Sequence, residues 1–255
     1  MKLKSFIAVL LFVWMALPVM AKNKTQVIAH RGYWKCEGSA QNSLRSLERA
    51  DEIKVYGTEF DVHLTADNVP VVHHDNTIQG VDIQSTPYEK LKDLKLENGE
   101  VLPTLQSYLD RAKKLKVKLI FELKPHATPE RDREAAKIVV DMINKMKLQK
   151  RTEYITFSME AGKELIRLAP KAQVAYLSGN VSPAELKKLG YTGLDYHFNV
   201  MKNHPQWFKE AKDLGMTVNV WTIDDVTLMK EMKDMGADYL TTDMPEDALK
   251  VVKEK

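Results

Sequence analysis

The fold is decided by residues 173–198, which read QVAYLSGNVSPAELKKLGYTGLDYHF. Apolar runs at 173–177 and 194–198 have the length of buried strands, and a helical pattern separates them. Ser182 can cap that helix with its hydroxyl, and Pro183 suits its first position. Strand, helix and strand in this order predict two parallel strands joined by a right-handed crossover.

The same alternation extends over most of the chain. Apolar runs that predict strands begin near Val27, Glu59, Lys118, Tyr154, Gln173, Leu194, Thr217 and Asp238. Helical patterns follow them over 41–54, 104–116, 129–147 and 161–168, from Ser182 onward, and over 206–214, 226–235 and 245–253. Eight parallel strands, each followed by a helix, predict an α/β fold of the (β/α)8 TIM-barrel class.

One segment departs from this alternation. Residues 69–73 form a further extended run, and Asp67-Asn68 before it suits a hairpin turn. Residues 76–102 then carry turn residues and few apolar ones. We expect them to form a small insertion after the second strand, within a single domain.

The composition limits the classes of function. The chain has 255 residues, of which 44% are hydrophobic, and a net charge of +3 with acidic and basic residues interspersed. That charge is too close to neutral to indicate a nucleic-acid or anionic-membrane partner. A single cysteine, Cys36, excludes an internal disulfide and a cysteine-rich metal site.

The N-terminus has the pattern of a secretory signal peptide. Lys2 and Lys4 precede an apolar stretch over 6–19, and small residues lead to Ala21. A stretch of about fourteen residues is short for a membrane span, so we expect residues 1–21 to be cleaved off. An uncleaved anchor is the alternative. Residues 22–255 would then form one exported domain, periplasmic or secreted.

Carboxylates stand at the ends of two predicted strands. Glu59 and Asp61 are two residues apart on the second strand and therefore point to the same side. Glu122 ends the third strand, and the carboxyl ends of barrel strands share one face, so all three can converge. Three oxygen donors without soft ligands favour one divalent cation, Mg²⁺ or Ca²⁺, over zinc or copper. A solvated strand edge is the alternative for the Glu59–Asp61 pair alone.

Histidines and cations accompany these carboxylates. His30 and Arg31 end the first strand, and Lys124 ends the third. The two cations can neutralise phosphoryl oxygens or pair with the carboxylates, and both roles can hold together. Phosphodiester cleavage needs a base and an acid, and imidazole can act as either near neutral pH. His73 and His74 would face opposite sides of a continuing strand, so only one can enter the site. The remaining histidines are expected at the surface or in the core: His63, His126, His197 and His204.

Five motifs occur in a characteristic order and approximate spacing. They read His30-Arg31-Gly32, Gln41-Asn42-Ser43, Glu59-Phe60-Asp61, Val72-His73-His74-Asp75 and Phe121-Glu122-Leu123-Lys124. Together with the later pieces Val220-Trp221-Thr222 and Leu240-Thr241-Thr242-Asp243-Met244-Pro245, they resemble the glycerophosphodiester phosphodiesterase family. The resemblance extends from about Val27 to Pro245.

This resemblance implies a (β/α)8 enzyme that hydrolyses glycerophosphodiesters to glycerol phosphate and an alcohol, with a divalent cation. The insertion corresponds to a small one that the family carries over its site. By the same resemblance the site residues are His30 and His74 as general base and acid, Glu59, Asp61 and Glu122 as metal ligands, and Arg31, Lys124 and Trp221 as substrate contacts.

The chain departs from the family pattern at two positions. Gln41 stands where the family usually has glutamate, which removes a formal charge near the site and affects local polar contacts or metal preference. Asp224 stands where an asparagine is frequent, and we expect it to alter substrate contacts at the rim. None of the three assigned metal ligands is replaced.

Two other functions remain as alternatives. A related phosphodiesterase could act on lysophospholipids or phosphoinositides, although the sequence has no long apolar loop for insertion into a membrane. A non-catalytic barrel that captures a phosphate ligand would be expected to lack a histidine or a metal ligand. The sequence decides neither the head-group alcohol, nor water against the glycerol 2-hydroxyl as nucleophile, nor the oligomeric state.

Overall fold

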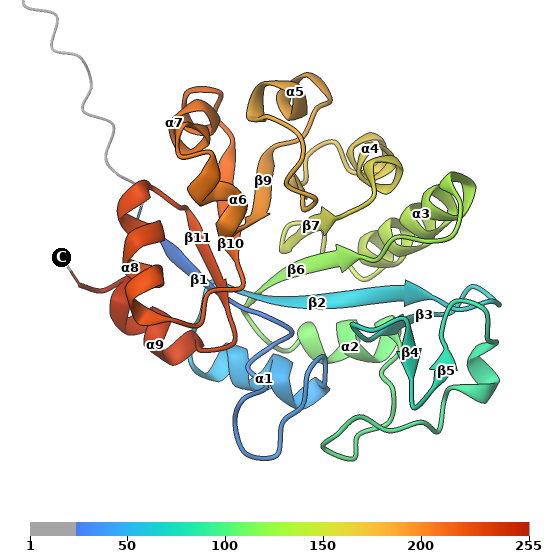
Figure 1. Cartoon of the computed structure of the whole chain (residues 1–255). Coiled ribbons are helices and arrows are strands. Elements are labelled where there is room, and N and C mark those ends of the chain that lie inside the picture. The colour runs from blue at the N-terminus through green and yellow to red at the C-terminus, as the bar shows by residue number, and fades with distance from the viewer. Residues whose placement is uncertain (1–23, 255) are drawn as a thin grey trace, which may run out of the picture.

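The computed structural model describes residues 24–254 and shows a closed parallel barrel surrounded by helices (Figure 1). The barrel strands are β1 (Gln26–Ala29), β2 (Gly57–Leu64), β6 (Lys118–Leu123), β7 (Thr152–Thr156), β8 (Val174–Tyr176), β9 (Gly193–His197), β10 (Thr217–Trp221) and β11 (Tyr239–Thr242). Strand β1 pairs with both β2 and β11, which closes the ring. A further strand, β3 (Pro70–Val72), pairs antiparallel with the end of β2. The predicted TIM barrel with an additional extended run is confirmed.

Most of the helices begin at a residue whose side chain caps the helix. They are α1 (Leu44–Glu52), α2 (Leu105–Ala112), α3 (Pro129–Lys145), α4 (Met159–Leu168), α5 (Pro183–Lys188), α6 (Phe198–Asn203), α7 (Gln206–Asp213), α8 (Val226–Met235) and α9 (Pro245–Val251). Ser182 and Glu185 form a capping box at α5, with Pro183 in the first helical position as predicted. The same side chain-to-backbone bond starts five other helices, at Ser43, Thr104, Thr128, Ser158 and Asp225.

Apolar side chains lie on both sides of the strands. Between strands and helices, the rings of Phe60, Phe121 and Tyr154 belong to the main core, where Phe60 and Phe121 meet edge to face. Inside the barrel, a smaller cluster contains Ile28 and Ile120. Because both faces of a barrel strand are normally covered by apolar groups, charged residues on the inner face need a specific reason to be there.

Two departures from the predicted helices have a clear physical cause. The helix expected over 41–54 begins only at Leu44, because Asn42 adopts a left-handed conformation with φ of 60° and belongs to a turn. The short helix α6 was not predicted. The sequence prediction places its first residue, Phe198, in the preceding strand, because a helix of 6 residues gives too short a pattern to separate from a strand end.

The insertion after β2 and β3 has a core of its own. It contains the strands β4 (Thr77–Ile78) and β5 (Val81–Asp82) and the 3₁₀ turn η1 (Tyr88–Lys90). Its few apolar side chains gather against the barrel with Ala40 and Val71 in one buried cluster: Ile78, Ile83, Leu91, Leu96 and Leu102. The insertion is therefore a packed unit on the β2–β3 hairpin.

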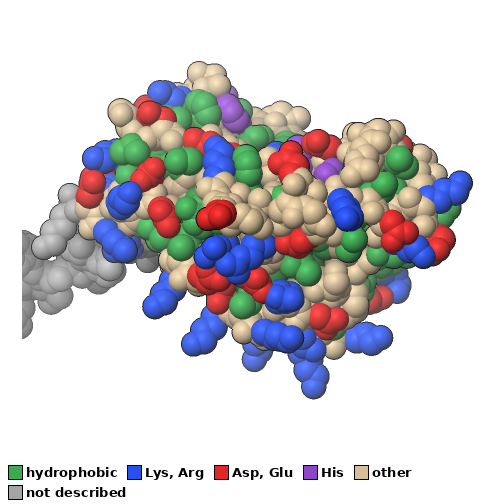
Figure 2. Space-filling view, turned by 90° about the horizontal axis from the view of Figure 1, so that it is seen from below, with side chains coloured by type: hydrophobic (Ala, Val, Ile, Leu, Met, Phe, Trp, Pro, Cys, Tyr) green, Lys and Arg blue, Asp and Glu red, His purple; other side chains and the backbone are tan. Residues whose placement is uncertain are grey.

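The surface carries both signs of charge close together. Acidic and basic side chains are interspersed on the face shown in Figure 2. Many are paired within a helix, as are Arg167 and Glu164 on α4. Among residues 24–254, none of the helices has the length and hydropathy needed to cross a bilayer. The predicted signal peptide, residues 1–21, lies outside the described residues.

Candidate active site

The first motif forms a tight turn directly after β1, and this turn lies against the neighbouring strand β2. Arg31 and Gly32 have φ of 54° and 78°. A Cβ atom on Gly32 would lie 2.3 Å from the hydroxyl oxygen of Ser46, so α1 can pack here only against glycine. The backbone N–H of Arg31 donates to Glu59 Oε2 at 2.8 Å. The turn therefore ties His30 and Arg31 to β2.

Glu59, Asp61 and Glu122 meet inside the barrel mouth as predicted. One oxygen of each carboxylate lies within 4.8 Å of the other two, and all three residues are buried. Burial, with Asp61 and Glu122 beside it, holds the pKa of Glu59 well above its ordinary value. Glu59 Oε1 accepts no hydrogen bond from any group in residues 24–254. An all-oxygen donor set with mutual repulsion and an unpartnered oxygen fits a hard divalent cation.

Lys124 lies among these carboxylates. Its Nζ atom is 3.3 Å from Asp61 Oδ1 and 2.9 Å from Glu122 Oε1. Burial alone would raise the pKa of Asp61, but the charges of Lys124, His74 and Arg31 and the hydrogen bond from Asn42 together lower it to about 2. Burial and the Asp61 charge instead raise the pKa of Glu122 to about 7. In this structure Lys124 therefore pairs with the carboxylates, one of the two roles that the sequence left open.

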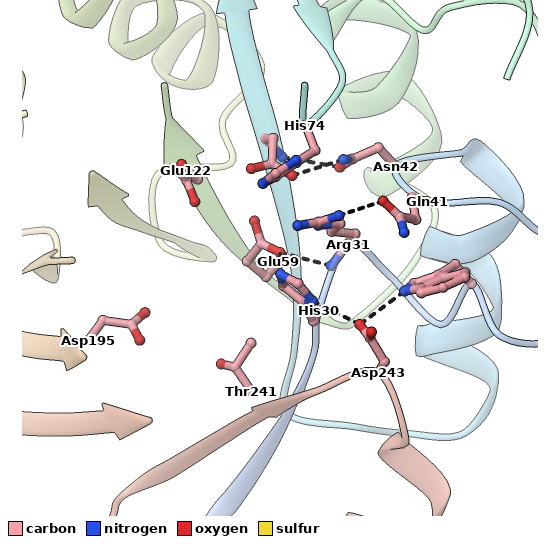
Figure 3. A network of polar contacts seen from close by, with 12 residues as sticks. His30, Arg31, Gln41, Asn42, Glu59, His74, Glu122, Asp195, Thr241 and Asp243 are labelled. Carbon is pink, nitrogen blue, oxygen red and sulfur yellow. Dashed lines mark hydrogen bonds and ion pairs between the residues drawn. The ribbon is translucent and has the colours of Figure 1, made fainter. Parts of the chain in front are cut away.

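Asn42 is a site residue that the sequence prediction missed. Its side chain donates to Asp61 Oδ2 at 2.9 Å and accepts from the backbone N–H of Asp61 at 3.1 Å (Figure 3). Asn42 belongs to the motif Gln41-Asn42-Ser43, to which the sequence prediction gave no ligand or catalytic role. The neighbouring Gln41 accepts a hydrogen bond from Arg31 Nη1 at 2.6 Å. The departure at Gln41 thus acts on the Arg31 guanidinium and not directly on a metal ligand.

His30 is held by a carboxylate from the opposite end of the chain. Its Nδ1 lies 2.8 Å from Asp243 Oδ1, which also accepts from the indole N–H of Trp34 at 3.0 Å (Figure 3). A carboxylate accepts only, so Nδ1 carries the proton and Nε2 is left free on the cavity side. Nε2 lies 4.0 Å from Glu59 Oε2. Asp243 is the second residue to which the sequence prediction gave no role.

Asp224 supports this carboxylate. Its Oδ1 accepts the Thr242 hydroxyl at 3.0 Å and the backbone N–H of Asp243 at 2.9 Å, and its other oxygen lies 3.3 Å from Lys35 Nζ. The structure thus gives Asp224 a supporting contact to the loop that holds His30.

His74 faces the cavity and His73 does not. Strand β3 ends at Val72, so the expected alternation of the two side chains does not itself extend to them. His73 Nε2 bonds the carbonyl of Thr77 at 3.2 Å, within the insertion. His74 Nδ1 lies 2.7 Å from Asp75 Oδ1, and its backbone carbonyl bonds His63 Nε2 at 3.2 Å. One of the two histidines enters the site, as expected, and it is His74.

A cavity at the carboxyl ends of the strands joins these groups. Six of the eight predicted site residues line it: His30, Arg31, Glu59, His74, Glu122 and Trp221. Asp61 and Lys124 lie behind this lining, where Lys124 forms ion pairs with Asp61 and with the lining residue Glu122. Ile155, Phe157 and Leu177 form an apolar wall near Trp221, and the remaining polar lining residues are Thr222, Asp195 and Thr241. Sequence reasoning assigned no role to these last two polar residues.

Asp195 gives a prediction about stability and pH. Burial raises its pKa to about 8, although a hydrogen bond from Asn219 opposes the shift. The unfolded value is about 3.9, so between pH 4 and 8 the folded chain binds a proton that the unfolded chain does not. The free energy of unfolding therefore falls as pH rises through this range. Asp195→Asn removes that contribution, and urea unfolding at pH 5 and pH 8 should show a smaller loss of stability in the variant. An equal loss in both proteins contradicts the raised pKa.

A model of the glycerophosphoryl diester phosphodiesterase family matches residues 30–247. A glycerophosphodiester phosphodiesterase from Caldanaerobacter subterraneus subsp. tengcongensis is 27% identical over 249 residues, covering 90% of this chain and 98% of the relative. The matched range contains every residue of the candidate site.

Solved structures show the same architecture. A glycerophosphodiester phosphodiesterase from Parabacteroides distasonis is 65% identical, with a TM-score of 0.90 over 91% of this chain and 98% of that one. A phosphodiesterase from Oleispira antarctica, solved in complex with the product sn-glycerol-3-phosphate, is 26% identical, with a TM-score of 0.79 over 90% of this chain and 97% of that one.

Proposed function

Because this chain belongs to the glycerophosphoryl diester phosphodiesterase family, we propose that it cleaves glycerophosphodiesters with the two histidines and three carboxylates of the cavity. The observation that carries this proposal is the convergence of His30, His74, Glu59 and Glu122 on one cavity from separate motifs. The reaction adds water across the phosphodiester and releases glycerol phosphate and an alcohol.

The charge of the phosphodiester is met by this chain's own cations. Arg31 lines the cavity, and its guanidinium can bind two phosphoryl oxygens in parallel. Lys124 lies behind the same wall, between Asp61 and Glu122. A divalent cation held by Glu59, Asp61 and Glu122, which we propose to be Mg²⁺ or Ca²⁺, would withdraw further charge from the phosphoryl group.

We propose that the two histidines transfer the protons of the reaction. His30 donates through Nδ1 to Asp243, so its Nε2 can take the proton of the attacking oxygen. That oxygen belongs to water or to the glycerol 2-hydroxyl, and the second route passes through a cyclic phosphate. His74 then gives a proton to the leaving alkoxide, with Asp75 holding its Nδ1. We also propose export, which rests on the signal-peptide pattern of residues 1–21.

A panel of substrates tests this function. Purified protein is incubated with glycerophosphocholine, glycerophosphoethanolamine, glycerophosphoglycerol and glycerophosphoinositol, and glycerol phosphate is measured enzymatically. We expect release from at least one of them. On lysophosphatidylcholine, measured by choline release, kcat/KM should be about 10²-fold lower, because the apolar part of the described lining, Ile155, Phe157, Leu177 and Trp221, is small beside an acyl chain.

Two results would count against the proposal. Cleavage of lysophosphatidylcholine in preference to every water-soluble diester would move the substrate to the lipid class. Binding of glycerol phosphate without turnover of any diester would make the barrel a ligand-binding protein.

A further inference from the structure

The floor of the cavity is a row of polar side chains that the mechanism above does not use. Asp195 on β9, Asn219 on β10 and Thr241 on β11 stand on three adjacent strands. Asn219 Nδ2 donates to Asp195 Oδ2 at 2.9 Å and lies 2.8 Å from Thr241 Oγ1. Asp195 and Thr241 line the cavity (Figure 3), so the row presents two oxygen-bearing side chains to whatever occupies it.

One oxygen of this row has no partner. Asp195 is 2% exposed, and its Oδ1 makes no hydrogen bond to any described group. A buried polar atom without a partner costs free energy, so such an atom in a cavity wall indicates a ligand contact. Burial also raises the pKa of Asp195 to about 8. The carboxyl group is then largely protonated at neutral pH and can both donate and accept.

The surroundings favour a neutral hydroxyl compound as the occupant. The charged group that bears on Asp195 is the Glu122 carboxylate, which disfavours an anion. Beside the floor, Phe157, Leu177 and Trp221 offer apolar contact for a short carbon chain. The Trp221 indole is fixed there by its hydrogen bond to the Asp195 carbonyl at 2.9 Å. A polyol arm has both kinds of surface.

We infer that Asp195 and Thr241 form the subsite for the glycerol arm of the substrate, with Asp195 Oδ1 bonding its terminal hydroxyl. This inference rests on the proposed function, because the phosphoryl group must lie at Arg31 and the metal ligands. Asp195 stands in the middle of β9 and also borders the barrel interior below the cavity. It therefore meets the end of the arm that is farthest from phosphorus. The variable alcohol then leaves toward the cavity mouth.

The test pairs a variant with a substrate that lacks the hydroxyl. The kcat/KM values of wild type, Asp195→Ala, Asp195→Asn and Thr241→Val are measured on glycerophosphocholine. They are measured again on the analogue whose glycerol is replaced by propane-1,2-diol, which keeps the 2-hydroxyl. We expect Asp195→Ala to lose roughly 10- to 100-fold on glycerophosphocholine and under about 3-fold on the analogue, because the lost bond is absent there already. Asp195→Asn should lose less than Asp195→Ala. Thr241→Val keeps the shape of the side chain and removes only its hydroxyl, so it should also lose less than Asp195→Ala.

The outcomes separate this inference from the proposed function. Wild-type turnover of glycerophosphocholine tests the function alone. If Asp195→Ala and Asp195→Asn lose activity equally on both substrates, Asp195 is a structural residue and the inference fails. The loss of kcat/KM in Asp195→Ala could instead differ about 10-fold between glycerophosphocholine and glycerophosphoglycerol. The floor would then bind the head-group alcohol, and the inference would also fail.

Discussion

The His74→Ala variant should lose about 10²- to 10⁴-fold in kcat on glycerophosphocholine. Choline leaves as a strongly basic alkoxide, and in our proposal the proton that it needs comes from His74. The imidazole lines the cavity, and Asp75 Oδ1, 2.7 Å from Nδ1, orients it. KM should change little, because the loss lies in the transition state. Steady-state kinetics with enzymatic detection of glycerol phosphate measures both constants.

The leaving group provides the diagnostic for this role. A glycerol phosphodiester of p-nitrophenol releases a stable phenolate without needing a proton, so His74→Ala should retain most of its activity on it. His30→Ala, which removes the base, should lose activity on both substrates. The matched control is His73→Ala, since His73 bonds Thr77 inside the insertion and does not line the cavity. An equal loss on both diesters in His74→Ala would show that His74 is not the general acid.

Removal of divalent cations should abolish turnover, with a loss of at least about 10³-fold. The three buried carboxylates repel one another, and burial with these neighbours holds the pKa of Glu59 above its ordinary value. A cation at this point relieves that repulsion, so its binding also stabilises the fold. With Mg²⁺ or Ca²⁺ at about 100 times its Kd, the stabilisation is about 2.7 kcal/mol, or a rise in Tm of about 5–10 °C. Differential scanning fluorimetry of chelator-treated protein measures it without reference to activity.

A substitution that removes the charge of one carboxylate and keeps its shape tests the assignment of the metal ligands. Glu59→Gln can keep the hydrogen bond from the Arg31 backbone while losing one anionic ligand, so the Tm response to cation should shift to about 10-fold or more higher concentration. Glu231→Gln on α8 removes a surface carboxylate that pairs with Lys202 and should leave the response unchanged. Full activity and an unaltered Tm after exhaustive chelation would rule out the cation.

The barrel could be predicted from the sequence because it depends on local patterns. The strand β9 and the helix cap at Ser182 follow from the apolar pattern and from capping chemistry, which neighbouring residues determine. The convergence of Glu59, Asp61 and Glu122 could also be predicted, since parallel strands bring their carboxyl ends to one face. Each of these steps needs only the order of elements along the chain.

The residues that support the catalytic groups could not be predicted in this way. Asp243 meets His30 across 213 positions of sequence, through a loop whose course depends on Asp224. Asn42 reaches Asp61 only because it adopts a left-handed turn conformation before α1. The choice of His74 over His73 came from family resemblance, because the strand ends before either residue. Such contacts depend on tertiary geometry that no periodicity encodes.

The insertion is expected to open at a lower free energy than the barrel. Gln84, within the insertion, lies 3.0 Å from both His63 Nδ1 and the Pro125 carbonyl, and His63 in turn bonds the carbonyl of His74. The backbone of His74, the proposed acid, is therefore linked through His63 to the insertion, whose small core is distinct from that of the barrel. Units with few buried contacts open at lower free energy than the whole molecule. We infer that warming opens the insertion before it unfolds the barrel. Activity is then lost at a temperature at which the barrel is still folded.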